Sequence, residues 1–211
     1  MTTVKLYGEH ASPATQCVMT VCNELGITCD FIFVDFMNGE HKTPEYINTR
    51  NPFGAIPVLV DNDGTQIFES RAISRYLTAK YGKNSGLLPN PGELEAYGRF
   101  EQAASIEHSS FDPHAAELAF QRNFAGMIGL EPDEKVVQKC IDTMNSKMEG
   151  YERILSKQKY LAGDNFTLAD LFHIPYGKHI NDIDPTIFGT KPSVKRWWED
   201  ISSRPSWKAL N

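Results

Sequence analysis

The side chains that could do chemistry lie at the starts of two predicted helices. Ser12 precedes Pro13, and Ser70 follows Glu69. Ser is a preferred N-cap, and Pro is favoured at the first position of a helix. A helix N-terminus favours negative charge, so a hydroxyl there can stabilise a thiolate and free N–H groups can hold a carboxylate. Taken alone, each serine is better explained as an N-cap, and Glu69 as a charge at the end of a strand.

A further candidate pair, His41 and Lys42, falls in a polar stretch over residues 37–50. Lys42 can supply positive charge, and His41 a hydrogen bond in either protonation state. Without further context the pair is more simply a solvated loop. We interpret the histidines without comparable context as surface or core residues, namely His10, His108, His114 and His173.

The four cysteines favour neither a metal site nor a disulfide framework. They stand at positions 17, 22, 29 and 140, with no CxxC pair and no spacing typical of zinc. On a helix, Cys17 and Cys22 would be separated by about 140° and would face different ways. We expect four free thiols and no metal.

Composition and charge restrict the partners. The chain has 211 residues and a net charge of −6, which argues against a nucleic-acid partner because phosphates favour a basic face. No apolar run approaches the roughly 18 residues that cross a bilayer, and the first residues do not resemble a signal peptide. We therefore expect a cytoplasmic protein with no membrane partner.

The elements that position these residues begin with a β-α-β pattern. Residues 4–8 alternate as in a strand, and residues 13–25 repeat apolar side chains at helical spacing before Gly26. Residues 28–36 are dense in Phe, Ile and Val, which predicts a strand covered on both faces. Residues 37–50 contain at most one helical turn, around 44–48.

A loop, a hairpin and a capped helix follow. Residues 51–57 form the loop, 58–60 and 66–69 the strands, and Asp, Asn and Gly at 61–64 the turn between them. Ser70 is the predicted N-cap of a helix in which Ile73 and Leu77 share a face, ending near Gly82. Residues 1–82 are therefore expected to form one α/β domain.

After residue 82 the sequence shows helical patterns and no further strand pattern. Residues 83–92 contain two prolines and two glycines and predict a linker. Helical patterns cover 93–124, with an interruption at Asp112-Pro113, and 132–158; a last helix carries Trp197 and is closed by Pro205. Thr167 and Asp170 form a T-x-x-D capping box, which we interpret as structural. The order β-α-β-β-β-α, followed by an all-α domain over 93–211, fits a thioredoxin-like fold.

Seven motifs occur in order along the chain: ASPAT at 11–15, GEHK at 39–42, NPFGAIP at 51–57, FESRAIS at 68–74, FDP at 111–113, YLAG at 160–163 and FTLADL at 166–171. Each is weak alone, but the ordered set is very specific. On these motifs the chain resembles a cytosolic glutathione transferase of the phi class, over nearly its whole length.

The resemblance implies a glutathione S-transferase of the serine type, with glutathione as co-substrate. Ser12 would donate a hydrogen bond to the glutathione sulfur, with Thr15 as the alternative hydroxyl. A thiol with a pKa near 8.5 is only a few per cent thiolate at pH 7, and a shift of about 2 pKa units, or about 2.7 kcal/mol, makes the thiolate the majority form. Serine in place of cysteine at this position favours conjugation or peroxide reduction over disulfide exchange.

The resemblance also implies residues that bind each part of glutathione. The glycyl carboxylate would bind His41 and Lys42. The cysteine would pair with the backbone of Ile56, ahead of a cis Pro57. The ammonium and α-carboxylate of the γ-glutamyl end would bind Glu69 and Ser70.

Two positions depart from the phi pattern. Ala55 stands where Gln is usual, which removes one hydrogen bond worth about 1 kcal/mol. Cys17 stands where Arg is usual, which removes a positive charge near the thiol. These departures keep open an alternative function, a non-catalytic carrier of hydrophobic metabolites.

The resemblance further implies a site for small hydrophobic electrophiles and a homodimer. The electrophile site would be lined by Met37, Phe111, Phe120, Phe124 and His179. Phe53 resembles an aromatic residue that inserts into the partner subunit of dimeric relatives.

Overall fold

The computed structural model describes residues 2–90 and 92–210, and its contacts divide the chain into two compact units. The first unit comprises Met1–Leu88 and Pro205–Asn211, and the helical unit comprises Pro89–Arg204. The sequence predicts that residues 205–211 belong to the helical domain, whereas their contacts group them with the first unit. Pro91, in the predicted linker, lies outside the described residues.

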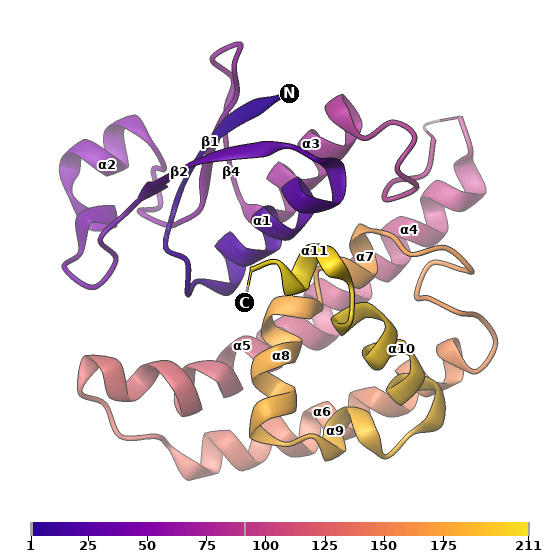
Figure 1. Ribbon diagram of the computed structural model, residues 1–211. Coiled ribbons are helices and arrows are strands. Elements are labelled where there is room, and N and C mark those ends of the chain that lie inside the picture. Colours follow the sequence, from indigo (N-terminus) through magenta and orange to yellow (C-terminus); the bar gives the residue numbers. More distant parts are fainter. Residues whose placement is uncertain (1, 91, 211) are drawn as a thin grey trace. The chain divides into compact units, whose positions relative to one another are not determined.

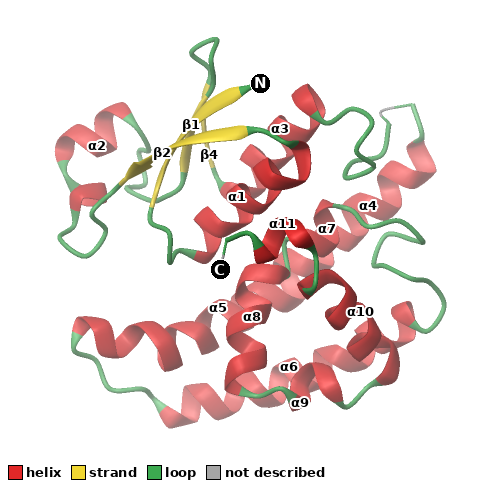
Figure 2. Cartoon of the chain, viewed as in Figure 1, coloured by secondary structure: helices red, strands yellow, loops and turns green. Residues whose placement is uncertain are grey.

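A four-stranded sheet organises the first unit (Figure 2). Its strands are β1 (Thr3–Gly8), β2 (Thr28–Phe33), β3 (Val58–Val60) and β4 (Gln66–Phe68), in the order β2-β1-β3-β4. β1 runs parallel to β2 and antiparallel to β3, and β3 and β4 form the predicted hairpin. The expectation that β2 is covered on both faces is wrong, because β2 is an edge strand and Phe33 is 57% exposed.

The helices of the first unit follow local signals with one exception. α1 (Pro13–Leu25) has Ser12 as N-cap and ends at Gly26, with φ 63°. A short turn, η1 (Glu40–Lys42), precedes α2 (Pro44–Thr49). α3 (Ser70–Tyr81) buries Ile73 and Leu77 as predicted, but its N-cap is Glu69 and Ser70 is its first helical residue. The prediction of Ser70 as N-cap is therefore wrong by one residue.

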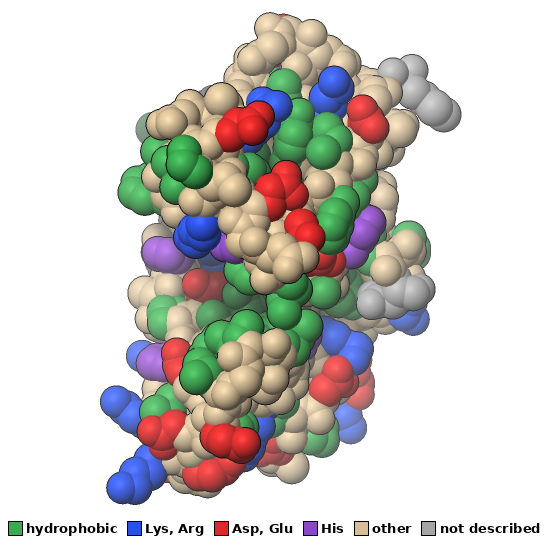
Figure 3. Space-filling view, turned by 90° about the vertical axis from the view of Figure 1, so that its left-hand side faces the viewer, with side chains coloured by type: hydrophobic (Ala, Val, Ile, Leu, Met, Phe, Trp, Pro, Cys, Tyr) green, Lys and Arg blue, Asp and Glu red, His purple; other side chains and the backbone are tan. Residues whose placement is uncertain are grey.

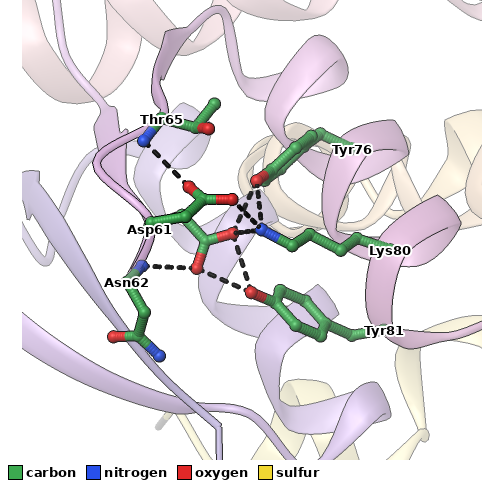
Figure 4. A network of polar contacts seen from close by, with 7 residues as sticks. Asp61, Asn62, Thr65, Tyr76, Lys80 and Tyr81 are labelled. Carbon is green, nitrogen blue, oxygen red and sulfur yellow. Dashed lines mark hydrogen bonds and ion pairs between the residues drawn. The ribbon is translucent and has the colours of Figure 1, made fainter.

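A buried carboxylate ties the β3–β4 turn to the end of α3 (Figure 4). Asp61 accepts hydrogen bonds from the hydroxyls of Tyr76 at 2.6 Å and Tyr81 at 2.7 Å, from Lys80 Nζ at 2.7 Å and from Asn62 N–H at 2.6 Å. Burial alone would raise the pKa of Asp61, but these donors outweigh it and lower the pKa to about 2. The hairpin and α3 are thereby fixed to one another.

The last helix of the first unit, α11 (Pro205–Lys208), packs on α1. Asn23 Nδ2 donates to the Ser206 carbonyl oxygen at 2.8 Å, and the Ser206 hydroxyl donates to Glu24. The sequence predicts that Pro205 closes the preceding helix. Instead Pro205 begins a new one, as its fixed φ allows at a first helical position.

The helical unit contains the remaining elements (Figure 1). They are α4 (Leu94–Ile106), the π turn η2 (Glu107–Phe111), α5 (Asp112–Ala119), the π turn η3 (Phe120–Phe124), η4 (Ala125–Ile128), α6 (Glu134–Leu155), α7 (Leu168–Leu171), α8 (Ile174–Ile183), α9 (Thr186–Gly189) and α10 (Pro192–Ser202). The predicted interruption at Asp112-Pro113 coincides with the end of η2.

The capping box of α7 lies in the core of the helical unit. Asp170 accepts from Thr167 N–H at 3.0 Å, from Leu161 N–H at 3.0 Å and from Trp197 Nε1 at 2.9 Å. Complete burial raises the pKa of Asp170, although these hydrogen bonds oppose the shift. The structural interpretation of this motif is confirmed.

The described surface carries both signs of charge. On the face shown in Figure 3, acidic and basic side chains are interspersed among apolar ones. Within residues 2–90 and 92–210, no helix is long and apolar enough to cross a membrane.

Candidate functional site

The register of the sheet gathers the predicted residues of the first unit at one end. Tyr7 of β1 pairs with Val58 of β3, and Val58 pairs with Phe68 of β4. At this end of the sheet, the adjoining residues are Gly8 after Tyr7, Pro57 before Val58 and Glu69 after Phe68. Three segments therefore start next to one another: the loop that leads to Ser12, the loop before β3 and the start of α3.

Ser12 caps α1 at this end. Its N–H donates to the Glu9 carbonyl oxygen at 3.0 Å, and its Oγ accepts a long hydrogen bond of 3.4 Å from Thr15 N–H. No described residue accepts the hydroxyl hydrogen of Ser12. A ligand atom with negative charge, placed at the positive end of α1, could therefore accept it.

Thr15 remains the alternative hydroxyl to Ser12. Its side chain is fully buried, and a Cβ added at Gly8 would lie 2.7 Å from Thr15 Oγ1. The hydroxyl therefore lies against β1, and Thr15 Oγ1 has no hydrogen-bond partner among the described residues.

The loop before β3 is held by side-chain hydrogen bonds and offers unpaired backbone groups. The Ile56–Pro57 peptide bond is cis, as the resemblance implies. The Ala55 carbonyl oxygen accepts from Tyr46 OH at 3.1 Å and from Asn51 Nδ2 at 3.0 Å. Among the described residues, no hydrogen bond uses the N–H or the carbonyl of Ile56, so both can pair with an extended peptide.

His41 and Lys42 lie against the same loop. Lys42 Nζ donates to the Gly54 carbonyl oxygen at 2.6 Å. His41 is 6% exposed and stacks on Phe36 with ring centroids 4.1 Å apart, and its Nδ1 has no hydrogen-bond partner among the described residues. Burial, and then the charge of Lys42, lower the pKa of His41. A cation and a buried, unsatisfied imidazole together suit a carboxylate.

Glu69 and Ser70 stand at the junction of β4 and α3. Glu69 has φ 72° and ψ 111°, the only positive φ among described residues other than glycine. Such strained backbone costs about 1–3 kcal/mol and clusters at binding sites. Ser70 opens a twelve-residue helix whose positive end suits a carboxylate.

The two departures from the phi pattern have structural consequences. Cys17 is buried, and its Sγ lies 3.8 Å from Ser74 Oγ of α3, so position 17 supplies packing and no charge. Ala55 contributes only its fixed carbonyl. None of the four cysteines forms a disulfide.

The residues predicted to line the electrophile site have different surroundings. Phe111 is 0% exposed and packs against His173 and Phe188 in the core of the helical unit. Phe111 therefore offers no surface to a ligand, and the prediction that it lines the electrophile site is wrong. Phe124 and His179 do meet, with centroids 5.3 Å apart, and are half-buried.

Two other residues predicted to line the electrophile site are more exposed than Phe111. Phe120 is half-buried in the same π turn as Phe124, and Met37 is exposed in the first unit. Phe53, predicted to contact a second subunit, is 72% exposed and has its ring edge-on to Phe68.

Some residues around the candidate site escape prediction from the sequence. Tyr46 and Asn51 fix the Ala55 carbonyl, although Asn51 is expected only as part of a loop and Tyr46 carries no signal. Asn123 Nδ2 lies 2.7 Å from His179 Nδ1. In the described part of the chain, no group of three His, Cys, Asp or Glu side chains could hold a metal ion.

Comparison with known proteins identifies the family to which the chain belongs. Residues 2–79 match the family model "Glutathione S-transferase, N-terminal domain", and residues 104–205 match "Glutathione S-transferase, C-terminal domain". Glutathione S-transferase PM239X14 of Arabidopsis thaliana is 60% identical over 94% of this chain and 91% of its own length.

Solved structures of glutathione transferases have the same fold as this chain. Glutathione transferase F7 from Populus trichocarpa is 35% identical, with a TM-score of 0.92 over 98% of this chain and 97% of that one. Maize glutathione S-transferase I in complex with an atrazine glutathione conjugate is 33% identical, with a TM-score of 0.89 over 98% and 95%. The predicted thioredoxin-like domain followed by an all-α domain is confirmed, and relatives include phi-class (F) members. The chain therefore belongs to the glutathione S-transferase family.

Proposed function

We propose that this enzyme activates the thiol of glutathione at Ser12 and adds it to small hydrophobic electrophiles. The observation that carries the proposal is the hydroxyl of Ser12, whose hydrogen has no acceptor among the described residues. A thiolate at the start of α1 would accept that hydrogen and face the positive end of the helix. Ser12 would act as a hydrogen-bond donor and not as a nucleophile.

The remaining site residues would bind the two ends and the centre of glutathione. The backbone of Ile56, oriented by Pro57, would pair with the cysteine. Glu69 and Ser70 would bind the γ-glutamyl end, and His41 with Lys42 the glycyl carboxylate. The cis peptide, the strained Glu69 and the unsatisfied His41 support this assignment.

The electrophile would be apolar and small. We propose that Phe120, Phe124 and His179 of the helical unit contact it, and that the enzyme is a cytoplasmic homodimer. The maize relative bound to an atrazine glutathione conjugate supports an apolar electrophile by analogy.

Reduction of organic hydroperoxides would use the same thiolate. Attack of sulfur on the hydroperoxide breaks the O–O bond, giving a glutathione sulfenic acid and an alcohol after protonation. A second glutathione then forms the disulfide and releases water. The reaction thus consumes two glutathione molecules and one hydroperoxide, and no residue of the chain is oxidised.

Replacement of Ser12 tests the proposal. We expect Ser12→Ala to lower conjugation of a chlorinated nitrobenzene by at least about tenfold while glutathione affinity stays within a few-fold, because a donor to the thiolate is lost. Ser70→Ala is the matched control and should weaken glutathione binding more than turnover. Unchanged turnover in Ser12→Ala would show that the role given to Ser12 is wrong.

The carrier alternative predicts a different result with the wild-type protein. A carrier would bind glutathione on an affinity resin but give no turnover with aryl halides, isothiocyanates or cumene hydroperoxide. Turnover with any of these excludes a purely non-catalytic carrier.

A further inference from the structure

The helical unit has a pocket on its surface between α4 and the end of α6. The volume of this α4–α6 pocket is about 440 Å³, within the usual range for small-molecule sites. Its described lining includes three cationic side chains, Arg99, Arg153 and Lys157, and one acidic side chain, Glu95. Because the whole chain has a net charge of −6, the positive charge here runs against the overall balance.

Only Arg99 has a carboxylate partner in the part of the chain that the structure describes. Its Nη2 lies 2.8 Å from Glu95 Oε1, so these two charges offset one another. Within residues 2–90 and 92–210, no hydrogen bond or ion pair uses the guanidinium of Arg153 or the ammonium of Lys157. These two cations lie one turn apart in the chain and line the same pocket, where like charges repel.

The acidic residues beside Arg153 on α6 are bonded to other groups. Glu149, one turn before Arg153, forms an ion pair with Lys191 at 3.2 Å. Glu152 accepts two backbone N–H groups at the start of α10, at 3.0 and 3.1 Å. Neither carboxylate therefore pairs with Arg153, although Glu149 has the sequence spacing of a helical ion pair.

Capping of α6 does not account for the two cations. Cations are favoured at a helix C-terminus because the last carbonyl oxygens lack partners. At this end of α6, Arg196 of α10 already donates to the carbonyl oxygens of Leu155 at 2.9 Å and Gln158 at 3.2 Å. The charges of Arg153 and Lys157 are therefore available to a ligand in the pocket.

The same pocket also has apolar lining. Ile154 and Ala162 are half-buried there, and Leu161 is buried. A neighbouring pocket of about 430 Å³ shares Ala162 and adds Leu94, which is 78% exposed. Cations beside apolar surface suit a ligand that carries negative charge on an apolar body.

We propose that the α4–α6 pocket binds an aryl phosphate dianion. Side chains one turn apart can reach a single headgroup, so Arg153 and Lys157 would both bind the phosphate oxygens. Ile154 and Ala162 would contact the ring. At about pH 7.5 a phosphate monoester carries nearly two negative charges, which matches the two unpaired cations. This binding activity goes beyond the proposed conjugation and uses none of the residues assigned to glutathione.

Equilibrium dialysis of the full-length protein against 1-naphthyl phosphate tests the proposal. Glutathione is added at saturating concentration, so that the proposed glutathione site is occupied. The comparison ligands are 1-naphthyl sulfate, which carries one charge, and neutral 1-naphthol. We expect the phosphate to bind at least about fivefold more tightly than the sulfate, and 1-naphthol to bind most weakly. Added salt should weaken binding of the phosphate, because the lining charges are exposed to solvent.

Replacement of the two cations locates the ligand. The double variant Arg153→Gln with Lys157→Gln should raise the Kd for 1-naphthyl phosphate at least about tenfold, because two charged donors are lost. Conjugation of a chlorinated nitrobenzene should be unchanged in this variant, which also shows that it is folded. The matched control, Lys135→Gln with Lys139→Gln, removes the same charge from exposed positions of α6 outside the pocket. Its Kd should stay within about twofold of the wild-type value.

Three results would overturn the proposal. An unchanged Kd in the pocket variant would mean that the ligand binds elsewhere. Equal weakening in both double variants would show a response to net charge alone. Equal affinity for the phosphate, the sulfate and 1-naphthol would remove the role of Arg153 and Lys157. An absence of turnover in the wild-type enzyme would contradict the proposed function only, because dialysis measures binding without turnover.

Discussion

Gly54 lies directly against the carbonyl oxygen of His41: a Cβ at position 54 would be 2.7 Å from that oxygen. Gly54 also has φ 58°, in the left-handed region that favours glycine. The loop that offers the Ile56 backbone and the turn that carries His41 and Lys42 are therefore in backbone contact. These two segments can approach so closely only because Gly54 has no side chain.

Gly54→Ala should consequently disturb both loops. We expect a loss of more than about 2 kcal/mol in the free energy of unfolding, because the left-handed φ and the close contact both oppose a Cβ. The KM for glutathione should rise at least about fivefold. Urea denaturation and initial rates provide the two measurements. Gly64→Ala is the matched control, with φ 84° but open space around its Cβ, and should cost about 1 kcal/mol without changing KM.

His41 should report the arrival of the glycyl carboxylate. The pKa of His41 is lowered in the free protein by burial and by Lys42. A carboxylate beside the ring would favour its protonated form, so saturating glutathione should raise the pKa. Proton NMR titration measures this shift. His114, whose pKa is also lowered by burial and by nearby lysines, should not respond; a His41 pKa that does not move would mean that the carboxylate binds elsewhere.

Asp61 should contribute to acid sensitivity. Its folded pKa of about 2 lies below the ordinary value of 3.8, so its stabilising contribution is complete above the ordinary value and is lost as pH falls toward 2. Asp61→Asn should lower the free energy of unfolding at pH 7 by about 2 kcal/mol, because the half-buried Tyr76 and Tyr81 and the more exposed Lys80 lose hydrogen bonds to a charged partner. It should also flatten the pH dependence between about 4 and 2 in thermal or urea unfolding.

Asp63 is the matched control for that substitution. Its side chain is 55% exposed and also bonds Lys80 at 2.6 Å. An exposed pair is worth at most about 1 kcal/mol, so Asp63→Asn should cost much less. Equal losses at the two positions would contradict the assignment of the stabilisation to the buried carboxylate.

Phe53 should determine association if the enzyme is a homodimer. An aromatic side chain with 72% exposure is a strong candidate for an interface anchor. Phe53→Ser should shift the sedimentation velocity boundary from dimer to monomer at micromolar concentration. Phe33→Ser removes another exposed Phe and should leave the boundary unchanged. A wild-type protein that sediments as a monomer would show that the dimer prediction is wrong.

Elements specified by neighbouring residues could be predicted from the sequence. Ser12, Pro13 and Gly26 mark α1 because N-cap, first-turn and C-cap preferences act within one turn of the chain. The turn at 61–64 and the Thr167 capping box are local in the same way. The ordered motifs added the cis peptide before Pro57, which no local rule provides.

Features that depend on distant contacts could not be predicted. The backbone strain at Glu69 and the donors to Asp61 arise from the pairing of β3, β4 and α3, which composition does not reveal. Phe111 and Phe124 look alike in a helical pattern, but the π turns place one in the core and leave the other half-buried beside His179. Pro205 is a stop signal by local rules, but the bonds from Ser206 to Asn23 and Glu24 hold it at the start of α11.

The position of α11 has a consequence for synthesis. The first unit includes residues 205–211, and Trp207 and Ser206 of that segment are buried. These residues are synthesised only after the entire helical unit has been made. The first unit therefore cannot complete its packing early during translation, although its sheet and most of its helices are synthesised first. Expression of residues 1–88 alone would leave the surface of α1 that faces α11 uncovered.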